Sequence, residues 1–183
     1  FAGVAPCIEK GFLDLTQFCH QNRIEWGVTT NGSAFHSEKI VRATVAARPF
    51  NVNMSLDSKR PELHDYSRGV ERSFQKITRG IESLARLRDA EGLDFSIIIK
   101  PVVHRLNFRL LPEMVSWIRE LGATAINFQP VDRWSPETYE ELWIDDPGEL
   151  EELLRVRDTL LEMKRAGAPI LNSETVLGAW ADH

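Results

Sequence analysis

The sequence has few of the features that mark secreted, membrane-spanning or nucleic-acid-binding proteins. Its 183 residues include only two cysteines, Cys7 and Cys19, and no secretory signal, which predicts a reducing, cytoplasmic setting with buried, unreactive thiols. No run approaches the roughly 18 consecutive apolar residues of a membrane span. Lysine and arginine form no block, and 22 of them against 27 acidic residues give a net charge of −5. We therefore expect neither a membrane nor a nucleic acid as a main partner.

The chain also has no initiator methionine. It opens at Phe1 and ends at His183 without an obvious closing element, so we expect an excerpt of a longer protein. Otherwise the composition is ordinary, because a hydrophobic fraction of 43% and a charged fraction of 27% are typical of globular proteins. A length of 183 residues predicts one domain with a substantial core.

Helical and extended segments alternate along the chain. Apolar residues at spacings of three and four predict helices over 5–22, 37–47, 70–90, 112–122 and 148–166. Strands are predicted near 24–30, 50–57, 95–103 and 124–131, with a fifth over 168–173 and a polar loop over 58–69. This alternation favours right-handed βαβ units around a parallel sheet.

Each predicted strand has one polar face, although buried parallel strands are usually apolar on both faces. In the second strand Val52, Met54 and Leu56 alternate with Asn51, Asn53, Ser55 and Asp57. Four such strands predict a wide or incomplete barrel, whose apolar faces meet the helices and whose polar faces line an interior. Polar residues close the strands and predict a polar ligand site there: Thr29, Thr30, Asn31, Ser55, Asp57, His104 and Gln129.

The residues that carry this pattern resemble the radical S-adenosylmethionine enzymes. The segments TTNG (29–32), SLDSKRPELHDYSRG (55–69), IIIKPVVHRLN (97–107) and ELGATAINFQPV (120–131) are similar to strands three to six of that family's barrel. The resemblance covers about 24–131, and its Ser-Leu-Asp loop and Phe-Gln-Pro strand are similar to the SPASM/twitch-bearing branch that modifies peptides and small molecules. It implies an α/β fold: a partial (β/α) barrel of four to five parallel strands with outer helices, with 1–183 forming one incomplete domain.

The resemblance also implies a chemistry. A [4Fe–4S] cluster in the whole protein would cleave S-adenosylmethionine to a 5′-deoxyadenosyl radical, which abstracts hydrogen from a peptide or small-molecule substrate. Ser55 and Arg68 would hold the methionine carboxylate and ribose region, since arginine grips carboxylates bidentately. Thr30, Asn31 and Asp57 would shape the pocket, and Gln129 would lie near the adenine.

The sequence departs from the family in what it omits. Neither the Cys-x₃-Cys-x₂-Cys cluster motif nor the Gly-Gly-Glu-Pro stretch is present, and Cys7 and Cys19 lie on one predicted helix. Because thiolates are the usual cluster ligands, we expect this chain to assemble no cluster. Truncation after strand two would explain the omission and would leave an exposed strand edge through which the chain self-associates.

Two other functions stay open. An aldolase- or isomerase-type barrel could use Lys100 at a strand end, although Pro101 follows it and no phosphate loop is visible. A non-catalytic, degenerate partner subunit that binds S-adenosylmethionine is the second. Ser55, Asp57 and Arg68 could also be a capped helix start with a surface salt bridge.

Overall fold

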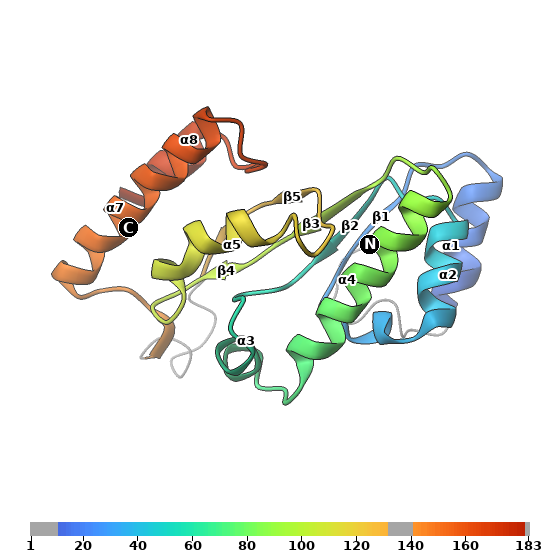
Figure 1. Cartoon of the computed structure of the whole chain (residues 1–183), viewed down its shortest axis with the longest axis horizontal. Helices are drawn as coiled ribbons and strands as arrows, with labels where there is room; N and C mark the ends of the chain where they lie inside the picture. Colours follow the sequence, from blue (N-terminus) through green and yellow to red (C-terminus); the bar gives the residue numbers. More distant parts are fainter. Residues whose placement is uncertain (1–10, 132–140, 182–183) are drawn as a thin grey trace.

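The computed structural model describes residues 11–131 and 141–181, in which helices and parallel strands alternate (Figure 1). The part of the predicted first helix before residue 11 lies outside the described residues, as do Cys7 and Trp134. In chain order the elements are α1 (Phe12–Gln21), β1 (Gly27–Thr30), the 3₁₀ helix η2 (Ser33–His36), α2 (Glu38–Ala46), β2 (Asn51–Met54), α3 (Pro61–Arg68), α4 (Ser73–Ala90), β3 (Ser96–Ile99), β4 (Val102–Val103), η3 (Phe108–Leu110), α5 (Leu111–Trp117), β5 (Ala125–Ile126), β6 (Gln129–Pro130), α7 (Pro147–Arg165), α8 (Glu174–Gly178) and η4 (Ala179–Ala181).

The strands form a four-stranded sheet with the order β1-β2-β3-β5, and every pair is parallel. A second ladder pairs β4 with β6, also in parallel. The predicted fifth strand is reduced to a single bridge between Ile126 and Ile170. The predicted α/β fold with a parallel sheet and outer helices is confirmed.

Alternation of the strand faces is also as the sequence predicts. Val28, Val52 and Ile97 stand beside one another in the register and are all 0% exposed, because α2 and α4 contribute to the same core. On the opposite face, Thr29 and Asn53 are only half-buried. The helices therefore cover the apolar face of the sheet and leave the polar face for other contacts.

Two of the predicted strands are interrupted. The segment predicted as 95–103 divides into β3 and β4 at Lys100 and Pro101, and the segment 124–131 divides into β5 and β6. Proline has no backbone N–H to donate to a ladder, which explains the break after β3. The Pro101 carbonyl still accepts the N–H of Gln129 at 3.0 Å, so the two ladders remain continuous with each other.

The prediction of a loop over 58–69 is wrong, since most of this segment is the helix α3. Pro61 stands in the first turn, where its missing N–H is harmless, and Gly69 ends the helix at φ 63°. Its residues are mostly polar and only His64 is buried, so the segment lacks the apolar stripe that identifies a helix in sequence.

The next helix, α4, begins at Ser73 rather than at the predicted Val70. Asp65, in the second half of α3, fixes this start, because its carboxylate accepts hydrogen bonds from the Arg72 N–H at 2.6 Å and the Phe74 N–H at 2.8 Å. An acidic side chain at a helix N-terminus satisfies free donors and favours the helix dipole. The turn between α3 and α4 is therefore held by one carboxylate.

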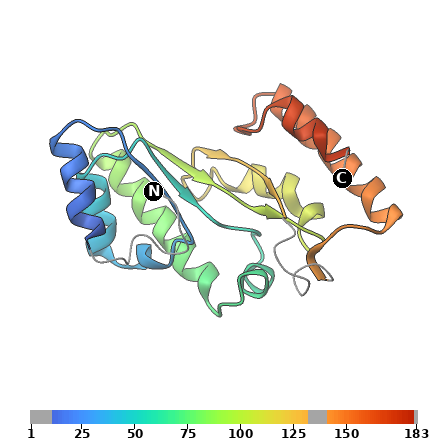
Figure 2. The same cartoon turned by 180° about the vertical axis from the view of Figure 1, so that it is seen from behind.

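The helices extend to both ends of the molecule (Figures 1 and 2). Both views place α1 and α2 at one end and α7 and α8 at the other, with the sheet between them. None of the helices in the described ranges 11–131 and 141–181 has the length and apolar character needed to cross a membrane.

Gly32, which precedes η2, provides a test of this packing. It has φ 75°, and a Cβ there would lie 2.6 Å from Cγ1 of the buried Ile77. Gly92 has φ 60° but no atom within 4 Å of such a Cβ. We expect Gly92→Ala to lower the free energy of unfolding by about 1–2 kcal/mol through backbone strain alone. Gly32→Ala should cost about 1–3 kcal/mol more, because overpacking is added to strain.

Urea denaturation of the two variants measures the difference. Equal losses of stability would contradict the close approach of Gly32 to α4.

Candidate functional site

A row of polar residues follows the C-terminal ends of the four strands. The pairing continues one residue beyond β1, β2, β3 and β5, since the N–H groups of Ser55, Lys100 and Asn127 donate to Thr30, Met54 and Ile99 carbonyls at 2.8–3.0 Å. The row consists of Asn31, Ser55, Lys100 and Asn127, and all four are half-buried. Ligands bind at this end of parallel strands in barrels and open sheets, so the row is the candidate site.

Asp57 lies two residues beyond this row and is 2% exposed. Its Oδ1 accepts hydrogen bonds from Arg68 Nη2 at 2.6 Å and from the Val102 N–H at 2.9 Å. Its Oδ2 accepts one from the Ser67 hydroxyl at 3.0 Å. This buried carboxylate therefore joins the end of β2 to α3 and β4, and Arg68 balances its charge.

Asn107 completes the connection and was not identified from the sequence as a site residue. Its Nδ2 donates to the carbonyls of Asp57 at 2.9 Å and Val102 at 2.7 Å, and its Oδ1 accepts the His104 N–H at 2.9 Å. It is 0% exposed. The one signal in the sequence was its place at the end of IIIKPVVHRLN, where a polar residue follows a buried strand.

Two buried histidines flank Asp57. The Nδ1 of His64 accepts the Asp57 N–H, and that of His104 accepts the Leu106 N–H, both at 3.2 Å. Burial lowers the pKa of each histidine to about 4, against a smaller opposing effect of the Asp57 carboxylate. Both rings are therefore neutral at pH 7 and carry their proton on Nε2. Each ring accepts a backbone hydrogen bond through Nδ1, so both histidines hold the chain around Asp57.

The residues predicted to bind the cofactor fall into three groups. Thr30 and Asn31 shape the turn after β1, because their side-chain oxygens accept the N–H groups of Gly32 and Ser33. Ser55 stands beside them, and Asp57 and Arg68 form the ion pair described above. Gln129 lies apart from these five, exposed on β6 and paired with Val102 in the second ladder.

Metal ligands are a different matter. Within 11–131 and 141–181, no group of three or more His, Cys, Asp or Glu side chains is placed to hold a metal ion. Cys19 is a free thiol that is 5% exposed. It lies on α1, which precedes β1 in the chain, and therefore does not follow the C-terminal end of a strand. The described residues therefore do not fit a [4Fe–4S] cluster, which takes thiolate ligands.

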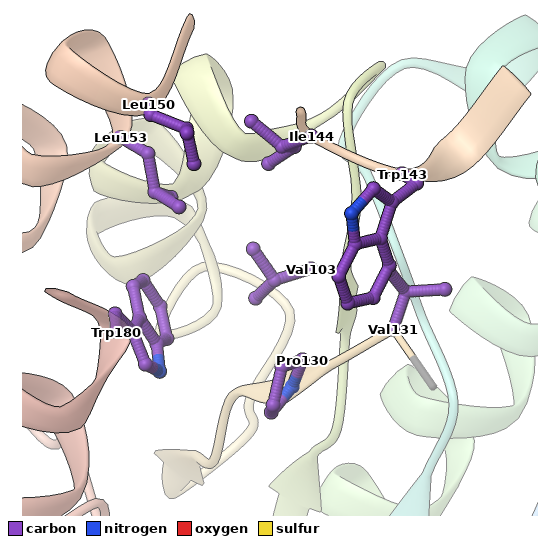
Figure 3. Close-up of a pocket in the computed structure, with 8 residues that line it drawn as sticks. All are labelled: Val103, Pro130, Val131, Trp143, Ile144, Leu150, Leu153 and Trp180. Atoms are coloured by element: carbon purple, nitrogen blue, oxygen red, sulfur yellow. The ribbon is translucent and has the colours of Figure 1, made fainter. Parts of the chain in front are cut away.

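An apolar pocket opens beyond the second ladder (Figure 3). Its walls come from the ends of β4 and β6, from the start of α7 and from two tryptophans: Val103, Pro130, Val131, Trp143, Ile144, Leu150, Leu153 and Trp180. The indole N–H of Trp180 is buried and has no hydrogen-bond partner in the described part of the chain. Val103 and Pro130 are neighbours in the second ladder, so both of its strands contribute to this pocket.

The two buried histidines predict a loss of stability in acid. Their folded pKa of about 4 lies below the ordinary 6.5, so between these values the unfolded state binds more protons. The free energy of unfolding is then highest above pH 6.5 and falls as pH decreases towards 4, by up to about 3 kcal/mol for each histidine. Urea denaturation at pH 7, 6 and 5 measures this slope.

His104→Gln should remove about half of the slope. The exposed His20 provides the control, because His20→Gln should leave the slope unchanged. A stability that is flat from pH 7 to pH 5 would contradict the neutral, buried state of both rings.

The tryptophans form a second test. Trp26 and Trp180 are 5% and 4% exposed, but Trp26 Nε1 donates to the Ala47 carbonyl at 2.8 Å whereas Trp180 Nε1 has no partner among the described residues. Replacement by phenylalanine removes a similar volume at both sites. We expect Trp26→Phe to cost about 1–3 kcal/mol more than Trp180→Phe, because it leaves a buried carbonyl unsatisfied. Equal thermal and urea stabilities of the two variants would disprove the difference.

Known proteins resemble the chain in sequence. No protein-family model matches it. It is 25% identical over 150 residues to the AdoMet-dependent heme synthase of Methanosarcina barkeri (strain Fusaro / DSM 804), covering 77% of this chain and 41% of that protein. It is 29% identical over 107 residues to the antilisterial bacteriocin subtilosin biosynthesis protein AlbA of Bacillus subtilis (strain 168), covering 57% of this chain and 22% of that protein.

Solved structures share its fold. Streptococcus suis SuiB bound to S-adenosylmethionine matches with a TM-score of 0.69 at 14% identity, over 92% of this chain and 37% of SuiB. SuiB bound to the precursor peptide SuiA gives a TM-score of 0.67 at 15% identity. The chain thus spans less than half the length of each of these three proteins. The likenesses to these relatives point to the radical S-adenosylmethionine superfamily as the group of proteins that this chain resembles.

Proposed function

We propose that this chain binds and orients S-adenosylmethionine in an enzyme that abstracts hydrogen from a peptide or small-molecule substrate. The observation that carries the proposal is the polar row at the ends of four parallel strands, fixed by the buried Asp57. Such a row, on a face that no helix of the core covers, offers a polar ligand several donors and acceptors at once. None of the relatives reported above supports the aldolase- or isomerase-type alternative, whereas the AdoMet-dependent heme synthase supports a site for S-adenosylmethionine.

The half of the row on β1 and β2 fits the cofactor. The Ser55 hydroxyl makes no hydrogen bond within the described part of the chain and is available to a carboxylate or a ribose hydroxyl. Arg68 gives one nitrogen to Asp57 but keeps a buried Nε without a partner among the described residues. A guanidinium has five N–H donors, so Arg68 can bind a second anion, the methionine carboxylate, beside Asp57.

The remaining predicted residues have lesser parts in this proposal. Thr30 and Asn31 hold the turn after β1, and this turn would form one wall of the pocket. Gln129 lies on β6, two residues beyond Asn127 of the row, and would lie near the adenine. When bound, S-adenosylmethionine supplies the radical chemistry, and the part of this chain is to bind it, orient it and exclude water. The cluster that the family uses would be held by residues other than the described ones.

Support for the substrate comes from the relatives. AlbA takes part in bacteriocin biosynthesis and SuiB has been solved with a precursor peptide, whereas the heme synthase acts in the synthesis of a small molecule. Peptide and small-molecule substrates are therefore both represented among proteins similar to this chain.

Calorimetric titration with S-adenosylmethionine tests the cofactor site. We expect saturable binding by the 183-residue chain, weakened about 3- to 10-fold by Ser55→Ala because one hydrogen bond is lost. Gln129→Ala should weaken binding by a smaller factor. Ser116→Ala is the matched control, since Ser116 is exposed on α5 away from the strand ends. An absence of binding at millimolar cofactor would refute the proposed function.

A further inference from the structure

Lys100 is the one charged residue of the polar row. It is half-buried, follows β3 directly and stands between Ser55 and Asn127 in the register. The structure shows no carboxylate within salt-bridge distance of its ammonium group in 11–131 or 141–181, and no hydrogen bond from it. The other half-buried lysine of these ranges, Lys164, donates to the Ile170 carbonyl at 2.7 Å.

The nearest acidic residue along the strands cannot become its partner. Asp57 lies two residues beyond Ser55 of the row. Its two carboxylate oxygens already accept hydrogen bonds from Arg68, Ser67 and the Val102 N–H. Its charge is balanced by Arg68 at 2.6 Å. A cation held partly away from water without a counter-charge is unfavourable, so a ligand that brings an anion would be stabilised here.

The neighbours of Lys100 define what that ligand is. Asn127 is half-buried beside it on β5, and its side chain makes no hydrogen bond to any described residue. An ammonium group and a carboxamide together present several N–H donors on one side of the row. We infer that Lys100 and Asn127 form a subsite for a carboxylate of the substrate, so that this enzyme selects an acidic peptide side chain or another carboxylic acid.

This inference rests on the proposed function for the cofactor on β1 and β2, and it assigns β3 and β5 to the substrate. Neighbouring strands lie about 4.8 Å apart, so Lys100 stands roughly that distance from Ser55. A substrate whose carboxylate is held by Lys100 is then close to a cofactor held at Ser55. The two ligands would then lie side by side, as hydrogen transfer between them requires.

The experiment uses two probes of the same size that differ at one group, a carboxylate in one and a neutral carboxamide in the other. N-acetyl-glutamate α-amide and N-acetyl-glutamine amide are titrated into the 183-residue chain, with and without S-adenosylmethionine, and binding is followed by NMR shifts of backbone amides. We expect the wild-type chain to prefer the glutamate probe by about 5-fold or more, as for a partly buried ion pair. Lys100→Gln should abolish the preference and Lys100→Arg should keep it.

Two further variants guard against indirect effects. Lys76→Gln removes an equal charge from an exposed position on α4 and should leave the preference intact. Lys100→Glu should reverse the preference, so that N-acetyl-lysine amide binds more tightly than the glutamate probe. A variant that merely unfolds would lose all binding instead of reversing it.

Three results would overturn the inference. The wild-type chain could show equal affinity for the glutamate and glutamine probes, or Lys100→Gln could leave the preference unchanged. Alternatively, Lys100→Gln could weaken S-adenosylmethionine while leaving 5′-methylthioadenosine, which lacks the carboxylate, unaffected. That result would assign the lysine to the cofactor. Loss of cofactor binding by the wild-type chain would refute the proposed function, yet the preference between probes measured without cofactor would still decide the role of Lys100.

Discussion

The candidate site depends on one buried carboxylate, that of Asp57. Taking this charge out of water costs several kcal/mol, and the structure offsets that cost with a guanidinium, a hydroxyl and a backbone N–H from α3 and β4. Each of these donors fixes a different element relative to the end of β2. The start of β4 at Val102 is therefore tied to the end of β2 through the Asp57 side chain, and Asn107 repeats the connection through the Asp57 backbone.

Much of the fold could be predicted because it follows from short-range patterns. The alternation of Val52 and Met54 with Asn51 and Asn53 gives the two faces of β2 without any knowledge of its neighbours. The helix α3 could not be predicted in this way, because it packs through His64 and is held by Asp57 rather than by an apolar stripe. Its evidence in the sequence was confined to its two ends, a proline in the first turn and Gly69 after the last.

The site was predictable in part for a similar reason. Resemblance and strand-end position pointed to Ser55, Asp57 and Arg68 together, and the structure shows the latter two as an ion pair. The row that joins Ser55 to Lys100 and Asn127 could not be predicted, because it depends on the register between strands that are far apart in sequence. The sequence of one strand shows which of its residues share a face. Which residues of neighbouring strands stand side by side depends on the register of the assembled sheet.

The two halves of the polar row differ in charge, and in our proposal they bind different ligands: the cofactor on β1 and β2, and the substrate on β3 and β5. With Asp57 and Arg68 balancing each other, Lys100 determines the net charge of the strand ends. S-adenosylmethionine itself has a net positive charge, since its sulfonium and ammonium groups outnumber its carboxylate. In the proposed complex the cofactor and Lys100 would repel each other until an anion lies between them, and a substrate carboxylate would relieve this repulsion at a short distance. Cofactor and substrate would then bind more tightly together than separately, which is a coupling that the neutral half of the row on β1 could not produce alone.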